Sequence, residues 1–200
     1  MRKFLLLIAC FTIVSGAAAQ PFEFGVKAGL NLANLTDELK GKMKPSFYVG
    51  VFGEIQATEF TRFQPEIIYS RQGSFDKGTI NGVATKVWIK YDYLNIPLII
   101  KLNVYKNLCL EVGPQLGFLI DANIKVKAEG VSSEVGVASE CVTFDFSVAM
   151  GLSYMFTRNI GVSARYNLGI TGTAKMYGYY GNSDNYAKNR VLQIGMMYKF

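Results

Sequence analysis

Charged side chains recur in this chain at alternate positions of several segments, where they share a face with small and polar residues. Glu23 and Lys27 stand on one such face, and Arg62 and Glu66 stand on another. The full set of candidate residues is Lys27, Glu54, Arg62, Glu66, Glu111, Asp145 and Arg165. Because an unpaired buried charge is strongly destabilising, we expect these residues to pair with one another inside the folded chain. The alternative is that they line a polar conduit or a small-ligand pocket.

Catalysis finds little support among the residue types present. The chain has no His, which removes Ser-His-Asp and Cys-His nucleophile activation and imidazole metal sites. No phosphate-binding Gly loop occurs, and Asn81-Gly82 is better explained as a turn. Cys109 and Cys141 fall at opposite ends of neighbouring predicted strands, too far apart for a disulfide. We therefore predict that the protein is not an enzyme, with no catalytic, cofactor-binding or metal-binding residue.

A period of two in hydrophobicity identifies the elements that would position the charges. From 142 to 156 every second residue is Val, Phe, Met, Leu or Tyr, and the residues between them up to Ser153 are small or polar. This alternation is typical of a β-strand with one apolar and one polar face. Eight such segments follow one another, at residues 22–34, 47–57, 62–73, 88–102, 108–122, 142–156, 160–171 and 190–200. In the fourth, Tyr91 and Tyr93 are out of phase with the apolar residues that follow, which indicates a β-bulge near Asp92.

The N-terminal residues have the composition of a secretory signal peptide. A basic start, an apolar stretch and three consecutive alanines lead to a predicted cleavage site after Ala19. The signal peptide is then 1–19, and residues 20–200 form one domain. A lipoprotein cleavage box ending at Cys10 is disfavoured, because it would cut the apolar stretch in half.

Composition narrows the fold class further. Half of the residues are hydrophobic, yet no stretch of the mature chain approaches the ~18 apolar residues of a membrane-spanning helix. Export with this composition favours a closed β-barrel, which satisfies its backbone inside a bilayer. We predict an all-β fold, a small eight-stranded antiparallel up-and-down transmembrane β-barrel. The net charge is +6, and two of the positive charges belong to Arg2 and Lys3 in the predicted signal peptide. The remaining charge is dispersed, so no nucleic-acid partner is expected.

The predicted connections between strands alternate in length. Short ones lie at 58–61, 103–107 and 157–159, and long polar ones lie at 35–46, 74–87, 123–140 and 172–189. Outer-membrane barrels have short periplasmic turns and long extracellular loops. We therefore predict a bacterial outer-membrane location, and the even number of strands places both termini in the periplasm.

Aromatic residues gather near the predicted strand ends, as in the interfacial girdles of membrane proteins. The set expected at the periplasmic end is Phe22, Phe63, Tyr154, Phe156, Tyr198 and Phe200. The set expected at the outer end is Phe47, Tyr69, Trp88, Tyr91, Tyr93, Phe118 and Phe144. Tyr198 and Phe200, in phase on the last predicted strand, resemble the C-terminal signal that the barrel-assembly machinery reads during insertion.

Several strand motifs resemble those of the PorT-like outer-membrane β-barrel proteins. They are FGVKAGLN at 24–31, QPEIIYS at 64–70, YLNIPL at 93–98, EVGPQLG at 111–117, ARYNLG at 164–169 and QIG at 193–195. The resemblance covers almost all of the mature chain and implies an eight-stranded barrel in the outer membrane. The family takes its name from a member tied to type IX secretion, but most relatives have no assigned activity, so the name implies no function here.

Three functional interpretations remain open from the sequence. The first is a non-enzymatic structural or interaction barrel, with outer-membrane lipids around it and envelope proteins as partners of its long loops. The second is a small pore or an accessory component of a type IX-like secretion machine. The third is a soluble lipocalin-like barrel, which is disfavoured because the lipocalin entry motif and C-terminal helix are missing. No cofactor is expected in any of them.

Overall fold

The computed structural model describes residues 22–35, 42–80, 83–128, 131–136, 144–175 and 186–200. These residues form nine strands: β1 (Phe22–Leu35), β2 (Lys42–Gln56), β3 (Thr61–Ile80), β4 (Val83–Tyr105), β5 (Leu108–Ala128), β6 (Val131–Gly136), β7 (Phe144–Met155), β8 (Ile160–Lys175) and β9 (Tyr186–Lys199). Among the described residues, no helix is long and apolar enough to cross a membrane. The predicted signal peptide lies outside the described residues.

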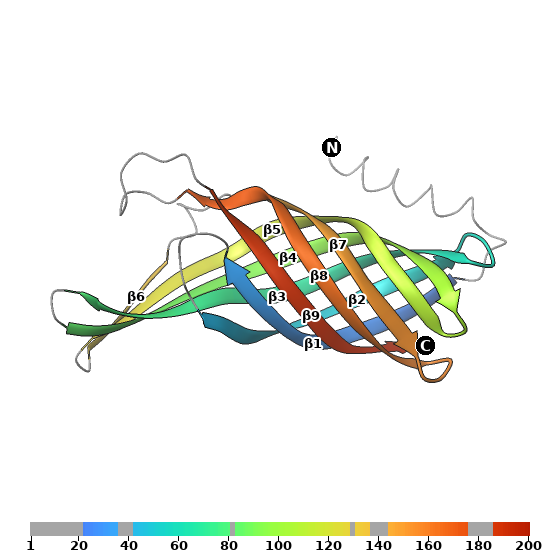
Figure 1. Cartoon of the computed structure of the whole chain (residues 1–200), viewed down its shortest axis with the longest axis horizontal. Helices are drawn as coiled ribbons and strands as arrows, with labels where there is room; N and C mark the ends of the chain where they lie inside the picture. Colours follow the sequence, from blue (N-terminus) through green and yellow to red (C-terminus); the bar gives the residue numbers. More distant parts are fainter. Residues whose placement is uncertain (1–21, 36–41, 81–82, 129–130, 137–143, 176–185) are drawn as a thin grey trace, which may run out of the picture.

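Eight of the strands close into an antiparallel barrel (Figure 1). Each barrel strand pairs with its neighbours in the order β4-β3-β2-β1-β9-β8-β7-β5, and a further pairing of β4 with β5 completes the ring. The first and last strands lie side by side, with Gly29 opposite Gly195. The predicted eight-stranded antiparallel barrel is thus confirmed, and β6 is an additional short strand that pairs with β5.

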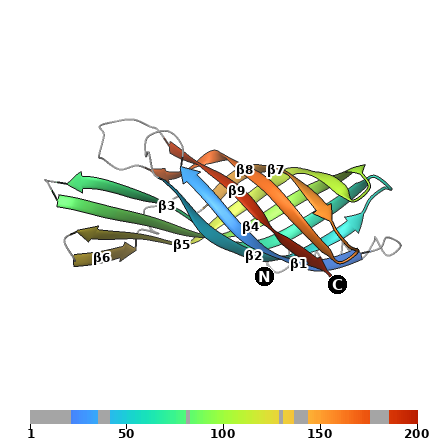
Figure 2. The ribbon, with the colours of Figure 1, turned by 60° about the horizontal axis from the view of Figure 1, so that its bottom comes forward.

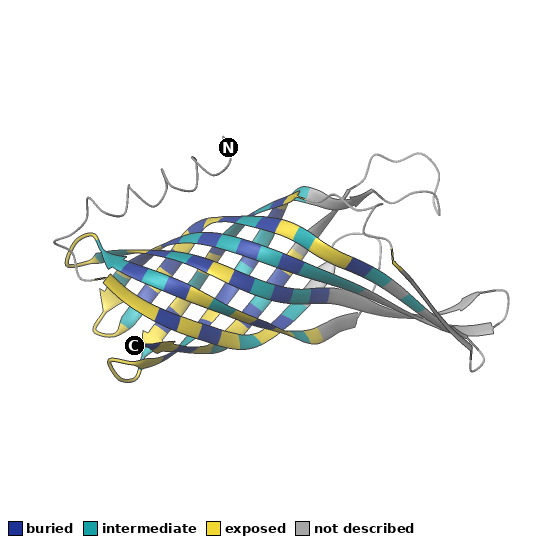
Figure 3. Cartoon of the chain, turned by 180° about the vertical axis from the view of Figure 1, so that it is seen from behind, coloured by how far each residue is buried: buried dark blue, intermediate teal, exposed yellow. Residues whose placement is uncertain are grey.

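The barrel has its apolar face outside and its polar face inside. On β7 the outward Met150 and Leu152 are 45% and 47% exposed, whereas the inward Ser147 and Ser153 are buried. Buried and exposed residues alternate along the strands (Figure 3). A barrel in water would bury its apolar face and expose its polar one. The inverted arrangement fits a molecule surrounded by lipid.

The two ends of the barrel differ in how their strands are connected. At one end, short turns at residues 57–60, 106–107 and 156–159 join the strands; we call this the short-turn end. At the opposite end, the hairpin end, strands β3, β4, β5 and β6 extend past the others (Figures 1 and 2). The extension corrects two predicted long loops, because residues 74–80, 83–87, 123–128 and 131–136 within them are paired strand residues.

The pairing of the extended hairpins is continuous. β3 and β4 pair from Gly73 opposite Lys90 to Ile80 opposite Val83, and β5 and β6 pair from Asn123 opposite Gly136 to Ala128 opposite Val131. β-Branched residues such as Ile80 and Val83 favour strand over loop conformations. The predicted Asn81-Gly82 turn itself lies outside the described residues.

The predicted irregularity near Asp92 is present, but the extra residue belongs to β5. Asp92 pairs with Asp121 and Tyr93 with Leu119, so Ile120 has no partner across the ladder. β4 keeps its phase through this point, and Tyr93 is buried inside the barrel at 2% exposure. Its assignment to the outer aromatic girdle was therefore wrong. The apolar residues of β4 lie on both faces because Tyr93 and Ile99 help to fill the interior.

Two inward aromatic residues of β2 pack over glycines of β1 and β9. Tyr48 and Phe52 are 2% and 1% exposed. A Cβ atom added to Gly25 would lie 2.3 Å from the Phe52 ring, and one added to Gly195 would lie 2.3 Å from the Tyr48 hydroxyl. An eight-stranded barrel is narrow enough to be filled by side chains, and here glycines make room for the two rings.

Candidate functional site: an ion-pair layer across the barrel

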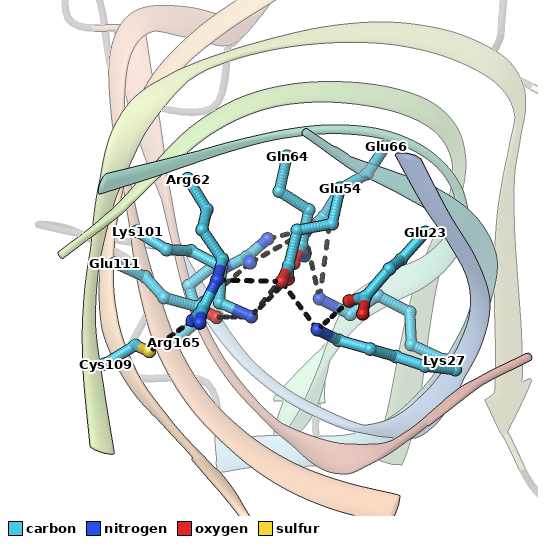
Figure 4. Close-up of polar contacts among 11 residues, drawn as sticks. Glu23, Lys27, Glu54, Arg62, Gln64, Glu66, Lys101, Cys109, Glu111 and Arg165 are labelled. Carbon is cyan, nitrogen blue, oxygen red and sulfur yellow. Dashed lines mark hydrogen bonds and ion pairs between the residues drawn. The ribbon is translucent and has the colours of Figure 1, made fainter. Parts of the chain in front are cut away.

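Inward side chains from seven of the eight barrel strands meet in one polar layer. They lie on alternate positions of their strands, so each points to the barrel axis. Figure 4 shows these side chains converging from the wall on the centre of the barrel. The layer contains Glu23, Lys27, Glu54, Arg62, Gln64, Glu66, Lys101, Glu111, Arg165 and Lys199.

Arg165 on β8 forms the centre of the layer. Its Nη1 and Nη2 donate to the two carboxylate oxygens of Glu66 at 2.9 and 2.8 Å. Nε and Nη2 also donate to Oε2 of Glu111 at 3.1 and 2.7 Å. The side chain of Arg165 is 2% exposed, and those of both carboxylates are fully buried. A planar guanidinium that serves two carboxylates in this way is a strong charge-assisted contact.

The contact between Arg165 and Glu66 spans the full width of the barrel. In the closed order of strands, β8 and β3 are four steps apart in either direction. The two residues therefore come from opposite walls and meet near the axis. Lys27 on β1 adds a second cation to Glu66, with Nζ 3.2 Å from both oxygens, and Gln64 donates to Oε1 at 2.6 Å.

Glu54 on β2 is the centre of a second cluster, nearer the short-turn end. Lys101 Nζ donates to its Oε2 at 3.1 Å, Lys199 Nζ donates to its Oε1, and Arg62 Nε lies 3.5 Å from Oε1. Lys101 joins the two clusters, because its Nζ is also 3.8 Å from Oε1 of Glu111. Each carboxylate at the centre of the layer thus has at least two cations beside it.

Of the seven predicted site residues, the structure brings six together and leaves Asp145 apart. Asp145 is buried, and its carboxylate accepts a hydrogen bond from the Thr171 hydroxyl at 2.9 Å. Glu111, Gly151 and Arg165 are aligned across β5, β7 and β8. Asp145 is six residues from Gly151 along β7, a separation of about 20 Å at ~3.3 Å per residue. It is therefore too far towards the hairpin end to pair with Arg165.

Sequence reasoning missed Lys101, Lys199 and Gln64. The signal for both lysines was present, since Lys101 stands between Ile100 and Leu102 and Lys199 stands beside Tyr198. Alternation alone assigns these lysines to the polar face. Both are buried, at 2% and 7% exposure.

Polar side chains continue towards the hairpin end, and several of their described atoms have no hydrogen-bond partner, as is also the case for Oε1 of Glu111 in the layer. Asn95, Gln115, Ser147 and Asn167 are buried and inward. Among the described residues, Nδ2 of Asn95, Oε1 of Gln115, Oγ of Ser147 and both amide atoms of Asn167 make no hydrogen bond. Buried polar atoms usually have a partner in the protein or in ordered water. This part of the interior is therefore polar without being cross-linked by charge.

The layer's chemistry is ion pairing, and the thiol of Cys109 lies at its edge. Cys109 is a buried free thiol, and Nη1 of Arg62 lies 3.7 Å from its Sγ. Cys141 lies outside the described residues. Within the part of the chain that the structure describes, no group of three or more His, Cys, Asp or Glu is arranged to hold a metal ion.

The aromatic residues expected at the periplasmic end all lie exposed at the short-turn end, between 37% for Phe63 and 70% for Phe200. Tyr198 and Phe200 make an edge-to-face contact with centroids 5.3 Å apart, and the Phe200 ring stacks on Phe24 at 5.7 Å. The Phe200 amide donates to the Phe24 carbonyl at 2.9 Å. Of the outer set, Phe47, Phe118 and Phe144 are exposed.

A closed barrel with lipid-compatible side chains outside and ion pairs inside is an integral membrane β-barrel. Residues 18–175 match the family model described as outer membrane protein beta-barrel domain, and the chain belongs to this family. The protein is therefore a bacterial outer-membrane barrel protein. A comparison with curated proteins finds no match.

Solved structures with the same fold include other outer-membrane barrels. Neisserial surface protein A is 17% identical with a TM-score of 0.50, and the match covers 90% of this chain and 97% of that one. Ail, the attachment invasion locus protein of Yersinia pestis, is 9% identical with a TM-score of 0.51, over 90% of this chain and 97% of that one. These likenesses show the fold.

Proposed function

We propose that this protein is a closed, non-enzymatic outer-membrane barrel with a structural or interaction role. The observation that carries the proposal is the bidentate contact between Arg165 and Glu66 from opposite walls. Buried ion pairs are held firmly because separating them leaves uncompensated charge in a poorly solvated interior. The layer is thus a plug, and the charged groups at its centre, Arg165, Glu66 and Glu111, are occupied with one another.

The sequence motifs support a finer family assignment, to the PorT-like barrels. FGVKAGLN at 24–31 and QPEIIYS at 64–70 supply Lys27 and Glu66, two members of the layer. Membership by itself assigns no activity.

The proposed orientation places the short-turn end and both termini in the periplasm. The predicted signal peptide and the known asymmetry of outer-membrane barrels support it. The hairpin end then faces outside, where β3, β4, β5 and β6 form a sheet beyond the barrel. An exposed sheet edge readily pairs with another chain, so we propose this sheet as the surface that meets envelope or external partners.

Cysteine labelling tests the orientation. Thr58→Cys in a short turn and Ser133→Cys in β6 are each introduced in a Cys109→Ser/Cys141→Ser background. A membrane-impermeant maleimide applied to intact cells should label Ser133→Cys, and Thr58→Cys only after the outer membrane is permeabilised. Labelling of Thr58→Cys alone on intact cells would show that the barrel is inverted.

We also propose that Tyr198 and Phe200 are read by the barrel-assembly machinery. Phe156 offers a matched control, because it is exposed at the same end and also makes an edge-to-face contact, with Tyr154 at 5.3 Å. Phe200→Ala should lower the amount of heat-modifiable protein in the outer membrane, and Phe156→Ala should leave it nearly unchanged. Equal losses in both variants would mean that Phe200 acts only as an interfacial aromatic.

A second candidate, a small pore or an accessory of a type IX-like secretion machine, is favoured by one observation. The unpartnered polar atoms of Asn95, Gln115 and Asn167 give the hairpin half of the interior a hydrophilic lining. A pore would require the ion-pair layer to open. A measurement of ion conductance therefore distinguishes the pore from the closed barrel.

A further inference from the structure

A cavity of about 510 Å³ lies at the short-turn end of the barrel, beside the Glu54 cluster. The Glu54, Lys101 and Lys199 side chains line one part of it, and the short turns at 106–107 and 157–158 line another. Small-ligand sites are commonly concave and of ~300–1,000 Å³. The cavity is therefore large enough for a small molecule.

The lining of this cavity is strongly cationic. Its charged residues are the cations Arg62, Lys101, Lys106, Arg158 and Lys199 and the carboxylates Glu23 and Glu54. Five cations against two carboxylates leave an excess of three positive charges. Arg62, Lys101 and Lys199 all contact Glu54, and Lys199 also contacts Glu23. The excess positive charge of the lining therefore rests mainly on Lys106 and Arg158.

Two of the cations come from turns. Arg158 follows Thr157, whose hydroxyl accepts the amide hydrogens of Asn159 and Ile160 at 3.2 and 2.9 Å and so fixes the turn. Lys106 has a φ of 44°, a left-handed conformation that favours glycine or asparagine. In the described part of the chain, neither Lys106 nor Arg158 forms an ion pair. Lys106 lines the cavity in this unusual backbone conformation, with its Nζ 5.2 Å from the centre of the Tyr105 ring. Such conformations concentrate at ligand sites, which is a reason to look for a ligand here.

We propose that this cavity binds a small water-soluble oxyanion, one that carries phosphate or carboxylate groups. Arg and Lys side chains form strong charge-assisted hydrogen bonds with such groups. The lining consists of inward and turn residues, whereas the lipid contacts the outward face, so a free anion rather than a lipid headgroup is the occupant. Binding does not depend on the proposed orientation, which sets only the compartment from which the anion enters.

Cys109 lines the cavity and serves as a reporter. The mature chain with Cys141→Ser, folded in a non-ionic detergent, is treated with an anionic sulfonatoethyl or a cationic trimethylammonioethyl methanethiosulfonate. After normalisation to free cysteine, the anionic reagent should react roughly ten-fold faster, because a cationic cleft concentrates anions. The ratio of the anionic to the cationic reaction rate should fall towards one in Lys106→Gln/Arg158→Gln. The control Lys77→Gln/Arg190→Gln removes the same amount of charge on β3 and β9, and it should retain the faster reaction with the anionic reagent.

Protection by inorganic pyrophosphate tests binding directly. Pyrophosphate should slow alkylation of Cys109 by neutral iodoacetamide, and sodium chloride of equal ionic strength should not. Pyrophosphate should also raise the unfolding temperature of the parent protein, but not that of Lys106→Gln/Arg158→Gln. This second measurement does not depend on the reactivity of Cys109. The proposal is overturned by equal rates with the two charged reagents, or by the absence of both protection and thermal stabilisation. Protection by phosphatidylglycerol in the micelle but not by pyrophosphate would also overturn it, in favour of a lipid headgroup.

Discussion

Arg165 binds Glu66 and Glu111 at once, and both carboxylates depend on it for charge compensation. Arg165→Ala would leave the two with Lys27 and Lys101, whose contacts are longer, at 3.2 and 3.8 Å. Breaking a buried ion pair by removing one partner typically costs about 3–5 kcal/mol. We expect a loss of that size in the free energy of unfolding, measured by denaturant titration in lipid vesicles.

The matched control is Arg158→Ala, which removes the same side chain from an exposed turn. An exposed substitution of this kind should change stability by about 0.5 kcal/mol or less. Arg165→Lys, which keeps the charge but loses the paired hydrogen bonds, should fall between the two. If Arg165→Ala and Arg158→Ala unfold at the same denaturant concentration, the layer does not stabilise the barrel.

At the residue scale, the sequence shows which side chains face inward but not which of them meet. Alternation places Lys27, Glu66 and Arg165 on polar faces, and the structure agrees. The pairing of Arg165 with Glu66 depends on closure of the barrel and on strand stagger, because the two are 99 residues apart in the chain. The same stagger separates Asp145 from the layer, which no local pattern reveals.

At the scale of the strand, the apolar outward face predicts that the cost of an introduced charge depends on its depth in the membrane. Met150 pairs with Val112 and Tyr166 near the middle of the exposed apolar band and is 45% exposed. Met150→Arg should cost roughly 2–4 kcal/mol, whereas Phe156→Arg at the short-turn end should cost about 0–1 kcal/mol. Unfolding in vesicles measures both. Equal costs for the two arginines would contradict the position assigned to the bilayer.

The eight barrel strands and their phase, except at Tyr93 of β4, could be predicted, since lipid outside and ion pairs inside impose a strict period of two. The ends of the strands could not be predicted, because β3, β4 and β5 continue past the other barrel strands, where that contrast no longer applies. The residues at 74–87 contain Asp, Lys, Thr and Gly and therefore resemble a loop in sequence. Backbone pairing, from Gly73 with Lys90 to Ile80 with Val83, makes residues 74–80 and 83–87 parts of β3 and β4.

At the scale of the whole molecule, the barrel joins three regions with different surroundings. The cationic cavity occupies the short-turn end, the ion-pair layer crosses the interior, and the sheet of β3, β4, β5 and β6 projects at the hairpin end. A closed layer between the two ends would keep them chemically separate. Binding at either end would then proceed without leakage across the membrane.

The most direct test of the closed layer is the ion conductance of folded residues 20–200 in planar lipid bilayers. Insertion is verified independently by heat-modifiable migration of the same preparation. A lumen closed by Arg165, Glu66 and Glu111 predicts no steady conductance from the wild type over a wide range of voltage. Reproducible single-channel steps from the wild-type protein would contradict the closed layer and establish the pore in its place.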